Sequence, residues 1–187
     1  MNWDKEKYDW PHYKLSSFVY SQPHTWHIQD TSLVTKNKKL PTILFIHGAG
    51  ASTHSWRLIL DYLKNNFRVL LIDLPGHGFT KLGKKNRSSL ECITQDLEML
   101  LINQKINPSL IIGHSAGSAV ALNLAVSKKT TGAVLTAAGK NILSFSPDPA
   151  EHAWSLTYDQ VLGASVGSAA TPFDAETYLS ALMNGVN

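Results

Sequence analysis

The sequence has a single cysteine, no long apolar run and, after residue 140, no lysine or arginine. Because Cys92 stands alone, an internal disulfide is excluded and a reducing compartment is suitable. No apolar run reaches the length that a membrane-spanning helix needs, and the first residues lack the pattern of a secretory signal. We therefore expect a cytoplasmic protein, with peripheral membrane contact left open.

Basic residues are unevenly distributed along the chain. All 17 lysines and arginines lie at or before Lys140, and five acidic residues follow it. The formal net charge of +3 is too small to indicate binding to nucleic acid. Two short basic clusters, at 36–39 and 81–87, are typical of solvated loops.

Apolar runs alternate with helical patterns in the middle of the chain. A length of 187 residues with 43% hydrophobic residues fits one globular domain. Short apolar runs indicate strands buried on both faces of a sheet, at 42–46, 68–72, 109–112 and 132–136. Apolar residues at helical spacing predict three helices. One spans 55–64, one follows a capping box formed by Ser88 and Glu91, and one spans 116–126. The pattern predicts an α/β protein whose mostly parallel sheet has helices on both faces.

The two ends of the chain depart from this alternation. Residues 1–16 are predicted to form an extended arm, followed by short strands at 17–20 and 25–29. Residues 1–140 would then be the N-terminal part of the domain, with the sheet truncated after about its sixth strand. Residues 141–187 are either a cap over the sheet or an altered tail, with helices at 150–162 and 174–183 as one interpretation.

The pentapeptide Gly113-His114-Ser115-Ala116-Gly117 has the form of a nucleophile elbow, a tight turn between a strand and a helix. Its two glycines lack the side chains that would crowd the turn. Ser115 occupies the position from which a serine oxygen attacks an acyl carbon. Because a buried strand precedes the pentapeptide and a helix follows it, Ser115 is the candidate nucleophile.

Two backbone amides are candidates for the oxyanion hole, which stabilises the negative charge that develops on the attacked oxygen. The first is the N–H of Ala116, which opens the predicted helix. The second is the N–H of Ala49, in a glycine-rich loop that follows the strand 42–46. This loop begins with His47 and Gly48 and continues through Gly50.

Histidines and an aspartate occur in the loops around this region. Asp73 and His77 lie in a loop that follows the strand 68–72, where we expect a shaped turn at the carboxyl edge of the sheet. We expect His47 and His77 to shape loops rather than to transfer protons. The histidines, with His114 among them, lack the spacing of metal ligands, so we expect no metal site.

These three loops, in their order and spacing over residues 17–136, resemble the α/β-hydrolase family. A closer resemblance is to its subgroup of magnesium-chelatase accessory proteins of bacteriochlorophyll synthesis. The segments that carry this resemblance are 10–12, 26–29, 47–57, 73–80 and 113–117. It implies a serine-hydrolase-like fold linked to a tetrapyrrole pathway, with a protein partner in that pathway. We expect no cofactor, and the small-molecule substrate is not identified by the residues.

The sequence departs from the family where an acid and a base are expected. In this fold an acidic residue and then a histidine follow the nucleophile, on loops after later strands. His152 is the only histidine after Ser115, and Asp148 precedes it. This pair could supply the acid and base, but its segment has no predicted strand to bring it beside the elbow.

Three functional interpretations therefore stay open. The protein could be a hydrolase of an ester or related acyl bond, with Ser115 as nucleophile. It could be an accessory or binding protein in which the triad is incomplete, because a serine without a histidine is a poor nucleophile near neutral pH. It could also be a truncated, non-functional fragment.

Overall fold

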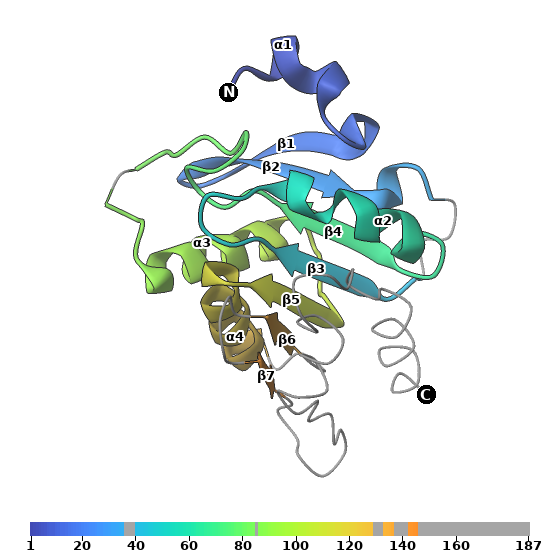
Figure 1. Cartoon of the computed structure of the whole chain (residues 1–187). Coiled ribbons are helices and arrows are strands. Elements are labelled where there is room, and N and C mark those ends of the chain that lie inside the picture. Colours follow the sequence, from blue (N-terminus) through green and yellow to red (C-terminus); the bar gives the residue numbers. More distant parts are fainter. Residues whose placement is uncertain (36–39, 85, 129–132, 137–141, 146–187) are drawn as a thin grey trace, which may run out of the picture.

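The computed structural model describes residues 1–35, 40–84, 86–128, 133–136 and 142–145. Within these residues the strands form one seven-stranded sheet in the order β1-β2-β4-β3-β5-β6-β7 (Figure 1). Strands β3, β4, β5 and β6 are parallel to one another, whereas β1, β2 and β7 pair antiparallel with their neighbours. The strands are β1 (Ser16–Ser21), β2 (His24–Asp30), β3 (Thr42–Ile46), β4 (Arg68–Ile72), β5 (Leu110–His114), β6 (Ala133–Thr136) and β7 (Ile142–Phe145).

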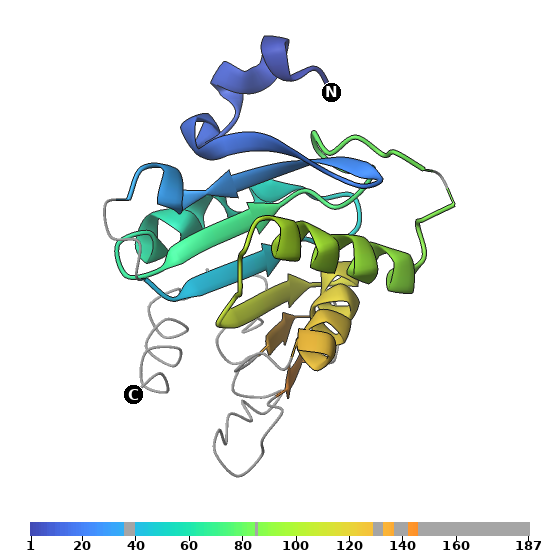
Figure 2. The same ribbon diagram turned by 180° about the vertical axis from the view of Figure 1, so that it is seen from behind.

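Helices cover both faces of the sheet. Helices α3 and α4 lie on one face and α2 lies on the other, as the two opposite views show (Figures 1 and 2). Among the described helices, none is long and apolar enough to cross a membrane. The α-helices are α1 (Trp3–Glu6), α2 (Arg57–Leu63), α3 (Leu90–Asn103) and α4 (Ala116–Lys128). Single 3-10 turns span Lys7–Asp9, Tyr13–Leu15, Thr31–Leu33 and Thr53–Trp56.

The apolar strands supply two separate cores, one on each face. Successive side chains of a strand point to opposite faces, so β3 sends Leu44 and Ile46 to the core beneath α3 and α4. Ile43 and Phe45 of the same strand enter the core beneath α2. All four are at most 2% exposed. A strand covered on both faces is apolar at every position, which is the pattern that the sequence shows here.

The predicted class, an α/β protein with a mostly parallel sheet and helices on both faces, is confirmed. The four apolar runs and the two N-terminal strands all occur as strands, within a residue or two of the predicted bounds. The sheet has one strand more than predicted, because β7 adds to its edge beyond β6. The helices predicted at 150–162 and 174–183 lie outside the described residues.

Two local predictions were wrong. The helix after β4 is capped by Ser89, whose hydroxyl accepts the Cys92 amide, and not by Ser88. The helix predicted over 55–64 does occur as α2, within two residues of the predicted bounds and after a 3-10 turn. The N-terminal arm was expected to be extended, yet it folds into short helical turns that pack on the sheet through aromatic rings.

The register of the parallel strands brings their following loops to one edge of the sheet. Ile46 of β3 pairs with Ile72 of β4 on one side and with Gly113 of β5 on the other. The next residues of these strands are His47, Asp73 and His114. The three loops singled out in the sequence therefore leave the sheet side by side, at its carboxyl edge.

Candidate active site

The elbow places Ser115 between β5 and α4 in a strained backbone conformation. Its φ angle is 52°, in the left-handed region that residues other than glycine rarely adopt. Helix α4 begins at the next residue, Ala116, so the N-terminal end of the helix lies directly beside the serine. Ser115 is half-buried and Ala116 is exposed, which leaves both open to a ligand.

Two glycines of the elbow have no room for a side chain. A Cβ added at Gly117 would overlap the carbonyl oxygens of Ile46 and His47. A Cβ added at Gly113 would lie 2.5 Å from the Gly117 carbonyl oxygen and 2.7 Å from Cβ of Ala121. The start of α4 thus lies against the end of β3, which requires glycine at residue 117, and against the end of β5, which requires glycine at residue 113.

The loop after β3 lies directly against the nucleophile position. A Cβ on Gly48 would be 2.9 Å from Cβ of Ser115, so the Gly48 backbone touches the elbow. Ala49, the candidate oxyanion donor, is the next residue and is exposed. Gly50 follows in the left-handed region, with φ of 70°, and turns the loop away. The structure thus brings Gly48, Ala49, Ser115 and Ala116 into one neighbourhood.

His47 fastens this loop to the loop after β4. One ring nitrogen, Nδ1, donates to the Gly48 carbonyl oxygen at 2.7 Å, and the other, Nε2, accepts the Leu74 amide at 3.0 Å. Burial lowers the pKa of His47, although the hydrogen bond to Gly48 and the charge of Asp73 act in the opposite direction. The ring is therefore neutral and its two nitrogens are both occupied.

His77 and His114 lie close to His47 and the elbow. The rings of His77 and His47 have centroids 5.2 Å apart, and His77 Nδ1 is 3.2 Å from the Pro75 carbonyl oxygen. His114 is exposed, immediately before the nucleophile position. Across the described ranges, no group of three or more His, Cys, Asp or Glu side chains is placed to hold a metal ion.

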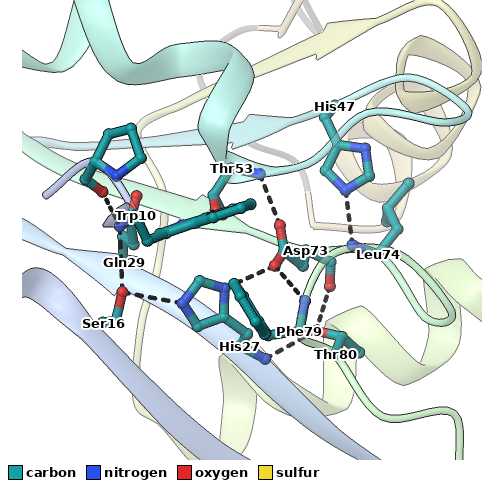
Figure 3. Close-up of polar contacts among 11 residues, drawn as sticks. Trp10, Ser16, His27, Gln29, His47, Thr53, Asp73, Leu74, Phe79 and Thr80 are labelled. Carbon is teal, nitrogen blue, oxygen red and sulfur yellow. Dashed lines mark hydrogen bonds and ion pairs between the residues drawn. The ribbon is translucent and has the colours of Figure 1, made fainter. Parts of the chain in front are cut away.

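Asp73 is the centre of a buried network that joins the loops (Figure 3). Its carboxylate accepts the Thr53 amide at 2.6 Å, the Phe79 amide at 2.9 Å and Nδ1–H of His27 at 2.7 Å. Burial alone would raise the pKa of Asp73, but the hydrogen bonds and charge of its partners outweigh this effect and lower it. Asp73 is thus an ionised carboxylate that shapes the turn after β4 and holds the loop after β3.

The sequence pointed to Asp73, whereas its partners His27 and Thr53 lie in segments of the family resemblance and were not singled out as site residues. His27 lies on β2, is fully buried, and also contacts Ser16 Oγ through Nε2 at 3.0 Å. Neither His27 nor His47 is available as a base for Ser115, because both nitrogens of each ring already have partners. Asp148 and His152, the predicted acid and base, lie outside the described residues.

Comparison with known proteins agrees with this geometry. The model of the alpha/beta hydrolase family matches residues 43–184. The magnesium-chelatase 30 kDa subunit of Rhodobacter capsulatus is 36% identical over 118 residues, which cover 63% of this chain and 40% of that protein. Epoxide hydrolase 3 of Xenopus tropicalis is 31% identical over 91 residues, which cover 48% of this chain and 25% of that protein.

A solved structure supports the same fold. An alpha/beta hydrolase from Novosphingobium aromaticivorans superposes with a TM-score of 0.57 at 22% identity, over 64% of this chain and 42% of that one. The chain thus spans less than half the length of these relatives. The matched model, the elbow and the sheet order lead to one conclusion: the chain belongs to the alpha/beta hydrolase family.

Proposed function

We propose that this protein acts on an ester or related acyl bond, with Ser115 as the nucleophile. The observation that carries the proposal is the strained Ser115 backbone at the start of α4, with the Gly48 backbone packed against it. A backbone held at a positive φ in this way is typical of functional sites, where the surrounding contacts maintain the strain.

The proposed reaction uses three groups of the described part of the chain. Ser115 Oγ attacks the acyl carbon, and the amides of Ala49 and Ala116 stabilise the oxygen that becomes negative. The dipole of α4 adds to this stabilisation, because its N-terminus faces the same region. The serine proton passes to a base, which returns it to the leaving alcohol as the acyl–oxygen bond breaks, and water then releases the acyl group from Ser115. We assign the role of base to His152, with Asp148 as the acid that orients it.

Labelling with a fluorophosphonate probe tests the nucleophile. The purified protein is incubated with the probe, and the modified residue is identified by mass spectrometry. We expect labelling at Ser115, its loss in Ser115→Ala, and no change in Ser55→Ala, which removes an exposed serine hydroxyl elsewhere. Absence of labelling in a folded wild-type protein would contradict the proposal.

A His152→Ala variant tests the base. If His152 accepts the proton, the labelling rate should fall by about a hundredfold or more, because a serine without its base retains only a residual reactivity. If the rate is unchanged, the base is another group, and the assignment of His152 and Asp148 is wrong.

The identity to the magnesium-chelatase subunit supports a second candidate function, an accessory role in tetrapyrrole synthesis. In this role the fold binds a pathway protein or intermediate, and Ser115 need not react. The test introduces the chain into Rhodobacter capsulatus that lacks its 30 kDa subunit, with pigment absorbance as the readout. Restoration by both the wild type and Ser115→Ala supports the accessory role, whereas no restoration by either counts against the pathway link.

A further inference from the structure

A chain of hydrogen bonds runs from the N-terminal arm through the sheet to the loop that carries Ala49 (Figure 3). Gln29 Nε2 donates to the Pro11 carbonyl oxygen at 2.7 Å and to Ser16 Oγ at 3.2 Å. Because Ser16 accepts this hydrogen, its own hydroxyl is free to donate to His27 Nε2 at 3.0 Å. His27 in turn donates through Nδ1 to Asp73.

This series of hydrogen bonds ends at Thr53, and the arm also contacts Thr53 directly. Asp73 accepts the Thr53 amide, which closes the polar path from the sheet. Trp10, the neighbour of Pro11, donates its indole N–H to Thr53 Oγ1 at 3.3 Å. The arm is therefore joined to residue 53 by two routes, one direct and one through four buried or half-buried side chains.

Aromatic rings shield this path from water. The ring of His27 has four neighbours with centroids between 5.2 and 6.3 Å, and they are Trp3, Trp10, Phe18 and Phe79. Trp3 and Trp10 both belong to the arm, so His27 is fully buried with the arm in place. Hydrogen bonds that are shielded in this way are stronger and fix a single arrangement of their groups.

The arm also adopts a constrained backbone where it meets α2. His12 has a φ of 55° and donates Nε2–H to the carbonyl oxygen of Arg57, the first residue of α2. The 3-10 turn Thr53–Trp56 lies between the loop and α2. The arm thus contacts the first residue of this turn, Thr53, and the residue that follows the turn, Arg57.

We infer that Trp10, His27 and Asp73 are positioning residues that hold the loop 48–53, and with it the Ala49 amide, against the elbow. The start of the loop is fixed by His47, through Gly48 and Leu74, and its end is fixed at Thr53 by the arm and Asp73. A donor that is fixed in advance stabilises a developing oxyanion without reorganisation. The part of this inference that concerns catalysis rests on the proposed function of Ser115.

Hydrogen–deuterium exchange on the full chain tests the structural part. Trp10→Phe keeps an aromatic ring but removes the indole donor, and Thr53→Val removes the acceptor. Each should speed amide exchange at residues 48–53, after correction for intrinsic rates, by about three- to tenfold, the effect of losing one hydrogen bond. Their effects should not add in the double variant, since both remove the same bond.

Controls separate this effect from general loss of stability. Thr53→Ser keeps the hydroxyl and should exchange like the wild type, and Tyr8→Phe changes an exposed ring of the arm. The Ile46 amide, inside β3, should keep its exchange rate in every variant. Unchanged exchange at residues 48–53 in Trp10→Phe, or additive effects in the double variant, would overturn the inference.

The fluorophosphonate labelling rate tests the link to catalysis. In Trp10→Phe the labelling rate of Ser115 should fall by a similar factor, about three- to tenfold, and Thr53→Ser should retain the wild-type rate. If the wild type labels and Trp10→Phe labels equally fast, the inference is overturned. If the wild type does not label although exchange responds as expected, the proposed function fails and the positioning of the loop stands.

Discussion

His27 donates Nδ1–H to the Asp73 carboxylate at 2.7 Å, a fully buried hydrogen bond between the middle of β2 and the residue that follows β4. The two residues are 46 positions apart in the sequence. Their contact connects the antiparallel part of the sheet to the carboxyl edge at which the nucleophile elbow lies. It therefore couples the stability of the fold to the geometry of the candidate site.

Asp73→Asn should lower the free energy of unfolding by about 2 kcal/mol or more at pH 7, because hydrogen bonds to a buried charge are lost. The pKa of Asp73 is lowered in the folded state, so below about pH 5 the unfolded chain binds more protons than the folded chain does. The stability that Asp73 contributes is thus present above its unfolded pKa and is lost as the pH falls through its folded pKa. Denaturant titrations between pH 3 and 7 measure this.

Asp61→Asn is the matched control for this titration. The pKa of Asp61 is also lowered, chiefly by its hydrogen bond with Lys64, but its side chain is 53% exposed. We expect a change of about 0.5 kcal/mol or less, since solvent screens an exposed pair. If the wild type and Asp73→Asn give parallel curves of stability against pH, the role assigned to the Asp73 carboxylate is wrong.

Gly117→Ala should destabilise the protein far more than Gly50→Ala. The added Cβ at residue 117 would press on the carbonyl oxygens of Ile46 and His47. A Cβ at residue 50 meets nothing within 4 Å, so that variant carries only the strain of its positive φ, about 1–2 kcal/mol. Thermal unfolding of the two variants measures the difference. Equal losses would show that α4 does not approach β3 this closely.

His47 should be the neutral tautomer with its proton on Nδ1, because Nε2 accepts the Leu74 amide. Its pKa is lowered by burial, so the unfolded chain takes up a proton near pH 6.5 before the folded chain does. Its contribution to stability is therefore full above pH 6.5 and declines as the pH falls through the folded pKa. Long-range 15N–1H spectra at pH 7 identify the tautomer, and a proton on Nε2 would contradict this arrangement.

The sequence predicts the parallel strands and the elbow because both have local signals. A strand covered on both faces is apolar throughout, as at 42–46, and the elbow needs glycine at fixed positions around Ser115. The polar network has no such local signal. Strand β2 has the sequence His-Thr-Trp-His-Ile-Gln-Asp, and the residues that its polar side chains contact lie far along the chain. Only the packing of β2 beside β4 brings His27 to Asp73.

Other differences arise where the local signal is ambiguous. Ser88 and Ser89 are adjacent and either can cap a helix, and the observed helix start at Leu90 selects Ser89. Strand β7 reads Ile-Leu-Ser-Phe, and its serine interrupts the continuous apolar run that indicates a buried strand. The arm is stabilised by rings from distant parts of the chain, such as Phe79 against Trp3, which local sequence patterns do not record.

Ser115→Gly should stabilise the protein while it removes the nucleophile. The Ser115 backbone has a φ of 52°, which costs a residue with a Cβ about 1 kcal/mol or more relative to glycine. Glycine also gains freedom in the unfolded chain, so the net gain should be close to 1 kcal/mol. Denaturant titration measures it, with fluorophosphonate labelling to confirm that reactivity is lost.

Ala119→Gly is the control for this last variant, because Ala119 is exposed within α4, one turn beyond the elbow. There glycine has no strain to relieve and should lower the free energy of unfolding by about 1 kcal/mol. The two substitutions should therefore change stability in opposite directions. A loss of stability in both variants would mean that the elbow holds Ser115 without strain, which would remove the observation on which its role as nucleophile rests.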